Sequence, residues 1–154
     1  MTAQCLLDAG GYQVTFAFHN GRASREYLDA VVELSLPAEL GAVAVKSQPT
    51  FIAVKDLQRL AAYLGEHVAA LQRDPDRDAP LFVPLELGFQ LQALSGDVDS
   101  DNDGEFTLRF MINVGQPAEG SRVYVGAEST VEVVRIREFI ASLEGIASES
   151  SRSR

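Results

Sequence analysis

The stretch Leu57-Gln58-Arg59-Leu60-Ala61-Ala62-Tyr63-Leu64 decides the fold, because its apolar spacing occurs twice in the chain. Its apolar positions fall on one face of a helix with 3.6 residues per turn: Leu57, Leu60, Ala61 and Leu64. The same spacing returns 79 residues later (136 − 57 = 79), at Ile136, Phe139, Ile140 and Leu143. This repeat predicts a duplicated strands-then-helix unit, with two similar halves at about residues 12–72 and 81–146.

Strand-like segments precede each helix, and those at 12–18, 27–36, 85–92 and 106–114 have the two-residue hydrophobic period that is typical of half-buried antiparallel strands. They cover residues 12–18, 27–36, 41–46 and 51–54 in the first half, and 85–92, 106–114, 123–125 and 131–134 in the second. Asn20-Gly21 suits a tight hairpin turn, although residues 22–25 are equally compatible with a longer loop. With helices expected at about 55–72 and 136–146, the fold class is α+β, mostly antiparallel β-sheet with two helices. The pattern is compatible with one curved sheet or with two packed sheets.

Two segments offer little apolar surface to bury. Residues 73–80 are charged and contain Pro75 and Pro80, so we expect a solvated connector between the halves. Residues 147–154 are rich in serine and charge, which favours a frayed, disordered tail. Residues 1–146 are therefore expected to form a single domain.

The composition narrows the classes of function. The 154 residues carry a formal net charge of −9, whereas a nucleic-acid-binding protein needs clustered Lys and Arg. No stretch approaches the roughly 18 consecutive apolar residues of a membrane-spanning helix, and the N-terminal residues lack the pattern of a secretory signal. We therefore expect no nucleic-acid partner, no membrane partner and a cytoplasmic location. An acidic surface can also steer a basic protein into contact.

The most distinctive local motif is the acidic segment at residues 97–105. Asp99, Asp101 and Asp103 alternate before Gly104, as in the first half of an EF-hand-type calcium loop, where alternate side chains converge on one ion. The position that should hold a bidentate Glu is Phe110, and strands rather than helices are expected on both sides. We expect a solvated hairpin loop without an ion and no cofactor; the alternative is a strand-loop-strand calcium site, with calcium as the one candidate cofactor.

The remaining polar residues form no recognisable catalytic arrangement. Cys5 has no partner for a disulfide and is expected to be a small buried residue of a first strand. His19 and His67 are both expected at the surface, because neither has a catalytic or metal-binding neighbour at a diagnostic spacing. These residues predict a protein that is not an enzyme.

A few aromatic and edge residues are candidate contacts with another protein. The tyrosines, with Phe82 and Met111 on expected exposed faces, are interface anchors if they face solvent, although packing in the core or on a sheet face is favoured for most of them. Residues 122–126 are compatible with an edge strand that is open to pairing with another chain.

Residues 27–34, the Gly-punctuated segment after them and residues 54–60 resemble WapI-type immunity proteins of bacteria. The likeness runs from about Tyr12 to Ile146 and includes the repeated ending at 131–143, with Tyr27 where family members often carry Trp. The family name derives from neutralisation of a secreted tRNA-cleaving toxin. The resemblance therefore implies a non-enzymatic protein that binds a protein partner, and the charge of −9 suggests a basic toxin domain as that partner.

Three other functions are compatible with the sequence. One is a calcium-responsive module centred on Asp99, Asp101 and Asp103. Another is a small hydrolase or ligand-binding domain that uses a groove between sheet and helices. The third is a symmetric dimer that forms through an exposed sheet edge.

Overall fold

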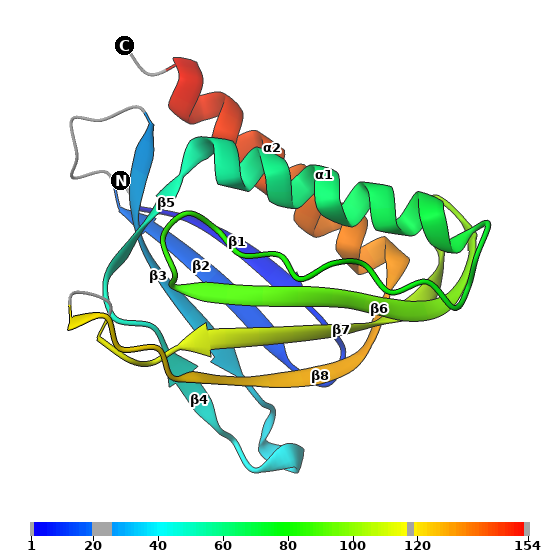
Figure 1. The fold of residues 1–154 in the computed structure, drawn as a ribbon, viewed down its shortest axis with the longest axis horizontal. Coiled ribbons are helices and arrows are strands. Elements are labelled where there is room, and N and C mark those ends of the chain that lie inside the picture. The colour runs from blue at the N-terminus through cyan, green and yellow to red at the C-terminus, as the bar shows by residue number, and fades with distance from the viewer. Residues whose placement is uncertain (1, 20–25, 117–118, 153–154) are drawn as a thin grey trace.

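Two antiparallel sheets and two long helices make up the protein, and the α+β prediction is confirmed (Figure 1). The computed structural model describes residues 2–19, 26–116 and 119–152. The first sheet contains β1 (Thr2–Asp8), β2 (Gln13–His19), β3 (Tyr27–Ser35), β4 (Ala44–Lys46) and β5 (Thr50–Ala53), and the short helix η1 (Ala38–Leu40) precedes β4. The second sheet contains β6 (Phe89–Ser100), β7 (Asp103–Asn113) and β8 (Tyr124–Glu132). The helices are α1 (Val54–Leu71) and α2 (Val133–Arg152).

Both sheets and both helices contribute to one hydrophobic core. Phe16 of β2 lies at its centre, with ring centroids 5.2 Å from Phe89, 6.0 Å from Phe110 and 5.7 Å from Phe139. These contacts join the first sheet to the second sheet and to α2. Burying an aromatic ring of this size contributes about 1.5–3 kcal/mol, so Phe16 is a major link between the two halves.

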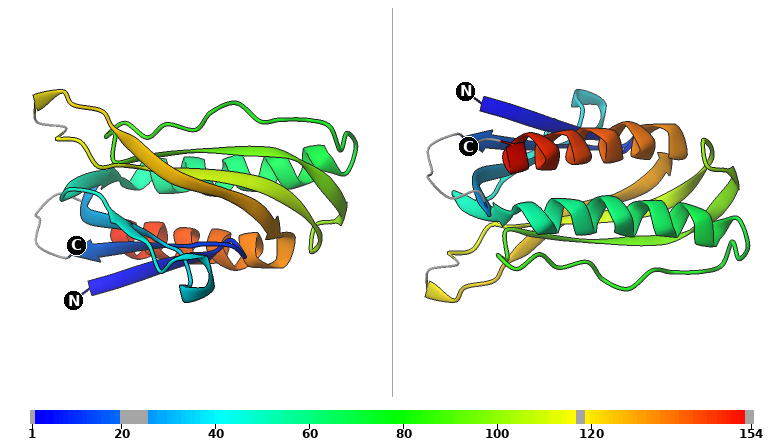
Figure 2. Two further views of the ribbon diagram at one scale, coloured as in Figure 1. Left: turned by 90° about the horizontal axis from the view of Figure 1, so that it is seen from below. Right: turned by 90° about the horizontal axis from the view of Figure 1, so that it is seen from above.

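Each helix makes its most extensive contact with a strand of the half of the chain that it does not follow. The helices lie side by side above the sheets (Figures 1 and 2). The helix that follows the first sheet, α1, contacts β6, while the one that follows the second sheet, α2, contacts β1. The hydroxyl of Ser142 on α2, for example, donates to the Cys5 sulfur at 3.2 Å. Each half of the chain therefore supplies a helix that packs against strands of the other half. The element order repeats strands and then a helix; common origin of the halves stays a prediction.

The second half differs most from the expected elements. Residues 85–88 were expected in a strand, but β6 begins only at Phe89. The acidic segment was expected to be a long loop; instead β6 and β7 run through it to a tight turn. The interruption expected at Gly126 is absent, because β8 is continuous.

The predicted tail is wrong for residues 147–152, which complete α2. Ala147 lies in the core, and the hydroxyls of Ser150 and Ser151 donate to the carbonyls of Ile146 and Ala147 one turn earlier. The predicted Asn20-Gly21 turn and residues 153–154 lie outside the described residues.

Candidate functional site

The β6–β7 hairpin carries a cluster of carboxylates that we call the acidic end: Asp97, Asp99, Asp101, Asp103, Glu105 and, on the neighbouring β8, Glu132. Ser100 pairs with Asp103, so only residues 101–102 connect the strands. Gly104 has φ 123°, and a Cβ at Gly96 would overlap the backbone of Glu105. The glycines therefore permit a close approach of the two strands that other residues would prevent.

Three of these carboxylates form a row across the second sheet. Asp97 lies opposite Glu105, and Glu105 lies opposite Glu132. All three are exposed, while the neighbouring Val98, Phe106 and Val131 are buried in the core, so the acids share the solvent face. Like charges that are directly opposite each other destabilise a sheet. The row is therefore a place where a bound cation or basic side chain would lower the free energy of the protein.

The tip of the hairpin is held against the helices through Asp101. The amide of Gln72, just after α1, donates to the Asp101 carboxylate at 2.7 Å. The Arg137 side chain of α2 donates to the Asp101 carbonyl at 2.7 Å, and its guanidinium lies 3.6 Å from the carboxylate. Within the described ranges this is the one salt bridge to the acidic end. The tip is therefore attached to both helices. By contrast, no described basic side chain forms a salt bridge with Asp97, Glu105 or Glu132.

The structure does not bring the predicted calcium ligands together. No three Asp, Glu, His or Cys side chains among the described residues lie close enough to hold a metal ion. The Asp101 carboxylate is engaged by Gln72 and Arg137, and Phe110 is fully buried in the core. Calcium bound to Asp99, Asp101 and Asp103 would require the tip to rearrange, and this site stays a prediction.

His67 is buried, so its predicted surface position is wrong. Its ring nitrogen Nε2 lies 2.8 Å from the carbonyl of Leu94 on β6, and the ring meets Phe106 edge-on at 5.0 Å. Burial lowers the pKa of His67, and the Leu94 carbonyl partly offsets this effect. The spacing from Leu60 and Leu64 places residue 67 on the apolar stripe of α1, a signal that could have predicted its burial. His19 is exposed, as expected.

Asp56 is a buried carboxylate that the sequence patterns did not single out. It lies in the first turn of α1 with 2% of its surface exposed, and it accepts a hydrogen bond from the Leu85 N–H at 2.8 Å. Arg59 pairs with it, and the Arg59 guanidinium lies 4.9 Å from the Phe82 ring centroid. Phe82 was expected on an exposed face, but only 4% of it is exposed. These contacts attach the segment before β6 to α1, and they have a structural role.

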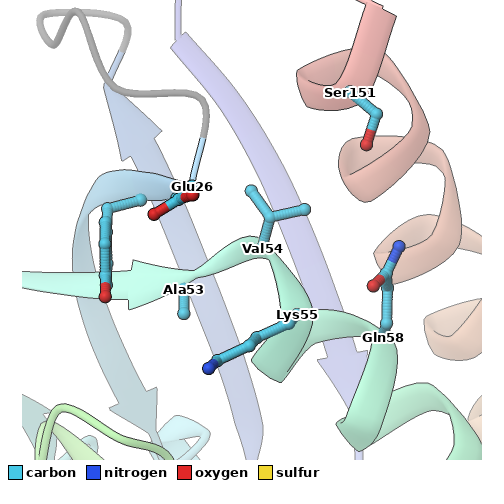
Figure 3. A pocket seen from close by; sticks show the side chains of 7 residues that line it. Glu26, Ala53, Val54, Lys55, Gln58 and Ser151 are labelled. Carbon is cyan, nitrogen blue, oxygen red and sulfur yellow. The ribbon is translucent and has the colours of Figure 1, made fainter.

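A cavity of about 350 Å³ lies where α1 begins, close to the last turn of α2 (Figure 3). It is lined by Glu26, Tyr27, Ala53, Val54, Lys55, Gln58 and Ser151. The Lys55 side chain points away from Ser151 in Figure 3, and the Ser151 hydroxyl donates to the Ala147 carbonyl at 3.0 Å. Figure 3 shows the Gln58 amide pointing toward Ser151, but Lys55, the one basic group of the lining, points away from both residues and does not converge with them on one ligand position.

The helices of the described chain include none with the length and apolarity needed to cross a membrane. Comparison with protein-family models finds no match to this chain, and comparison with curated proteins finds none either. The resemblance to WapI-type immunity proteins stays a prediction.

Proposed function

We propose that this chain is a non-enzymatic protein-binding protein of the immunity type, and that the acidic end contacts a basic domain of its partner. The observation that carries this proposal is the row of Asp97, Glu105 and Glu132 on the solvent face of the second sheet. Unfavourable cross-strand pairs cost about 0.2–1 kcal/mol each in a sheet. Lysine or arginine side chains of a partner would remove this cost on binding.

The support for the hairpin tip is the second part of the argument. Gln72 and Arg137 hold Asp101 in place, so a partner meets carboxylates on strands that are already ordered. A pre-ordered surface loses little conformational entropy when it binds. The net charge of −9 would also speed the encounter with a basic domain at low ionic strength. Neutralisation of a toxin is the biological form of this binding that the sequence resemblance suggests.

The test uses two triple variants with the same change in net charge. One is Asp97→Asn/Glu105→Gln/Glu132→Gln, and the control is Glu39→Gln/Glu66→Gln/Glu144→Gln at exposed acids elsewhere. Each immobilised protein is used to capture partners at increasing salt. We expect the wild type and the control to retain a basic protein that the first variant loses, and we expect salt to elute it. The captured protein should also lose its toxic activity when the wild type is added.

Thermal unfolding separates loss of binding from loss of structure. The first triple variant should be as stable as the control or more stable, because it removes repulsion across the sheet. If both variants retain the same proteins with the same salt dependence, the acidic end is not the contact surface. A retained partner with an acidic surface would count equally against the proposal.

A further inference from the structure

The outer edge of β8 is a second surface with unused bonding capacity. In the second sheet β8 pairs with β7 on one side and with no described strand on the other (Figure 1). The Val114 N–H donates to the Val123 carbonyl at 2.8 Å, which fixes the alternation along this antiparallel pair. The backbone groups of Tyr124, Gly126 and Glu128 consequently point away from β7. None of their N–H or C=O groups bonds to another described residue.

Only part of this edge is open. Towards α2, the Ser129 hydroxyl donates to the Ala9 carbonyl, and a Cβ built on Gly10 would lie 3.0 Å from the Thr130 carbonyl oxygen. The turn between β1 and β2 thus covers the second part of β8. Residues 124–128 remain, with Gly126 at the centre of the open stretch.

We propose that the occupant of this edge is a second copy of the chain, with the two β8 strands antiparallel about a two-fold axis at Gly126. In this register Gly126 lies opposite Gly126 of the second copy, and Tyr124 lies opposite Glu128 of the second copy. Every one of these residues presents its backbone groups outward, so each opposed pair exchanges two hydrogen bonds. The second sheets of the two copies then form one continuous sheet.

The side chains at the edge fit the same register. Val123 and Val125 are 51% and 42% exposed, and the two copies of Val125 become diagonal neighbours on one face. On the other face, Gly126 leaves space for the Tyr124 ring of the second copy, an arrangement by which an aromatic side chain covers an edge glycine. Arg122 lies just before the paired stretch, and its long side chain is within reach of Glu128 of the second copy, which gives opposite charges across the axis.

The net charge does not prevent self-association at this edge. Glu128 is already paired with Arg109 at 2.7 Å, and Arg122 adds a positive charge close by. Glu132 of the acidic end is six residues from Gly126, roughly 20 Å along the strand, whereas charges are screened over about 8–10 Å at moderate salt. The site is therefore distinct from the acidic end, which stays free for a partner.

The first test is the mass of the full chain in solution. At about 100 µM, sedimentation equilibrium should give twice the chain mass of 16.7 kDa. Val125→Glu places two carboxylates beside the axis and should raise the dimer dissociation constant at least about tenfold. The matched control is Val134→Glu on α2, at a residue 44% exposed, which should leave the dimer unchanged. A monomeric wild type, or a dimer that Val125→Glu does not weaken, would overturn the proposal.

The second test reads the register. A chain with Tyr124→Cys and a chain with Glu128→Cys are oxidised separately and as a mixture. Opposed residues of a hydrogen-bonded pair have Cα atoms about 5.5 Å apart, within disulfide range, whereas identical positions would lie roughly 13 Å apart. Crosslinked dimers are therefore expected in the mixture alone, since the native Cys5 is buried. Equal crosslinking of either variant by itself, or none in the mixture, would refute the two-fold axis at Gly126.

Discussion

The two edges of the second sheet are treated in opposite ways. Along β6, the connector (residues 73–80) and Phe82 after it bond to the backbone: Gly96 N–H donates to the Pro75 carbonyl, Ala79 N–H donates to the Ala93 carbonyl, and Phe82 and Leu91 exchange two bonds. Along β8, the backbone groups of Tyr124, Gly126 and Glu128 that point away from β7 have no such cover among the described residues. An open edge can pair with another strand, and natural proteins usually block it. A charged, proline-containing connector therefore protects one edge of this sheet, whereas residues 124–128 at the other edge are available for pairing.

Weakening the contacts that cover β6 should have the largest effect on the stability of the protein. Phe82 stacks on Phe89 with ring centroids 6.3 Å apart and contacts Tyr63 at 5.4 Å. Phe82→Ala should lower the free energy of unfolding by about 3–5 kcal/mol, since it leaves a cavity and frees the connector. Urea unfolding measures this loss, and light scattering should detect aggregation through the newly exposed edge. Leu85→Ala, at a neighbouring residue 57% exposed, is the control and should change stability by less than about 0.5 kcal/mol.

A smaller effect is expected from Gly126 on the open edge. A Cβ at this position would overlap the Phe110 carbonyl of β7. Gly126→Ala should therefore separate β8 from β7 and cost about 1–3 kcal/mol, because packed backbone cannot move aside cheaply. Gly145 on α2 has no atom within 4 Å of an added Cβ, and Gly145→Ala should stabilise the protein by up to about 1 kcal/mol. Equal stability changes for the two variants in urea would contradict the close approach of β7 and β8.

Lowering the pH should destabilise the β6 side of the second sheet more than the β8 side, because His67 contacts β6. Its pKa is lowered by burial in the folded state, so below the ordinary value of 6.5 the unfolded chain binds the proton more readily. The stabilisation from neutral His67 is complete above that pH and is lost as the pH falls through the lower folded-state pKa. We expect the protection of the β6 amides, measured relative to their intrinsic exchange rates at each pH, to fall before that of the β8 amides as the pH falls. His67→Gln should flatten the pH dependence of unfolding, and an unchanged slope would contradict this assignment.

The smallest effect is expected from calcium at the acidic end. Because Asp101 is engaged by Gln72 and Arg137, millimolar calcium chloride should change the melting temperature no more than magnesium chloride does. Saturable heat on calcium titration, abolished by Asp99→Asn, would instead support the calcium site that the sequence motif suggests.

The local elements were largely predictable from the sequence, because they follow from hydrophobic period. α1 was placed within one residue at each end, and β3 also closely matches its expected range. The acidic segment was recognised as a candidate site, but its strand geometry was missed. Its register depends on Gly96 and Gly104, whose role appears only when the opposite strand is present. For the same reason, the sequence predicted separate strands before and after Gly126, whereas β8 is continuous. A glycine within a strand pattern indicates either a break in the strand or a close approach of the neighbouring strand.

Local residue spacing was enough to predict the helical stripes, the alternating strands and the α+β class, because these depend on residues a few positions apart. Packing between distant parts of the chain brings α1 against β6 and α2 against β1, and it places the connector along β6. It also leaves residues 124–128 of β8 without a bonded neighbour on their outer side among the described residues. It also decided that Asp56 and His67 are buried, through partners at Leu85 and Leu94. Such contacts join residues far apart in the chain, and their energies depend on how the two halves pack rather than on any local pattern.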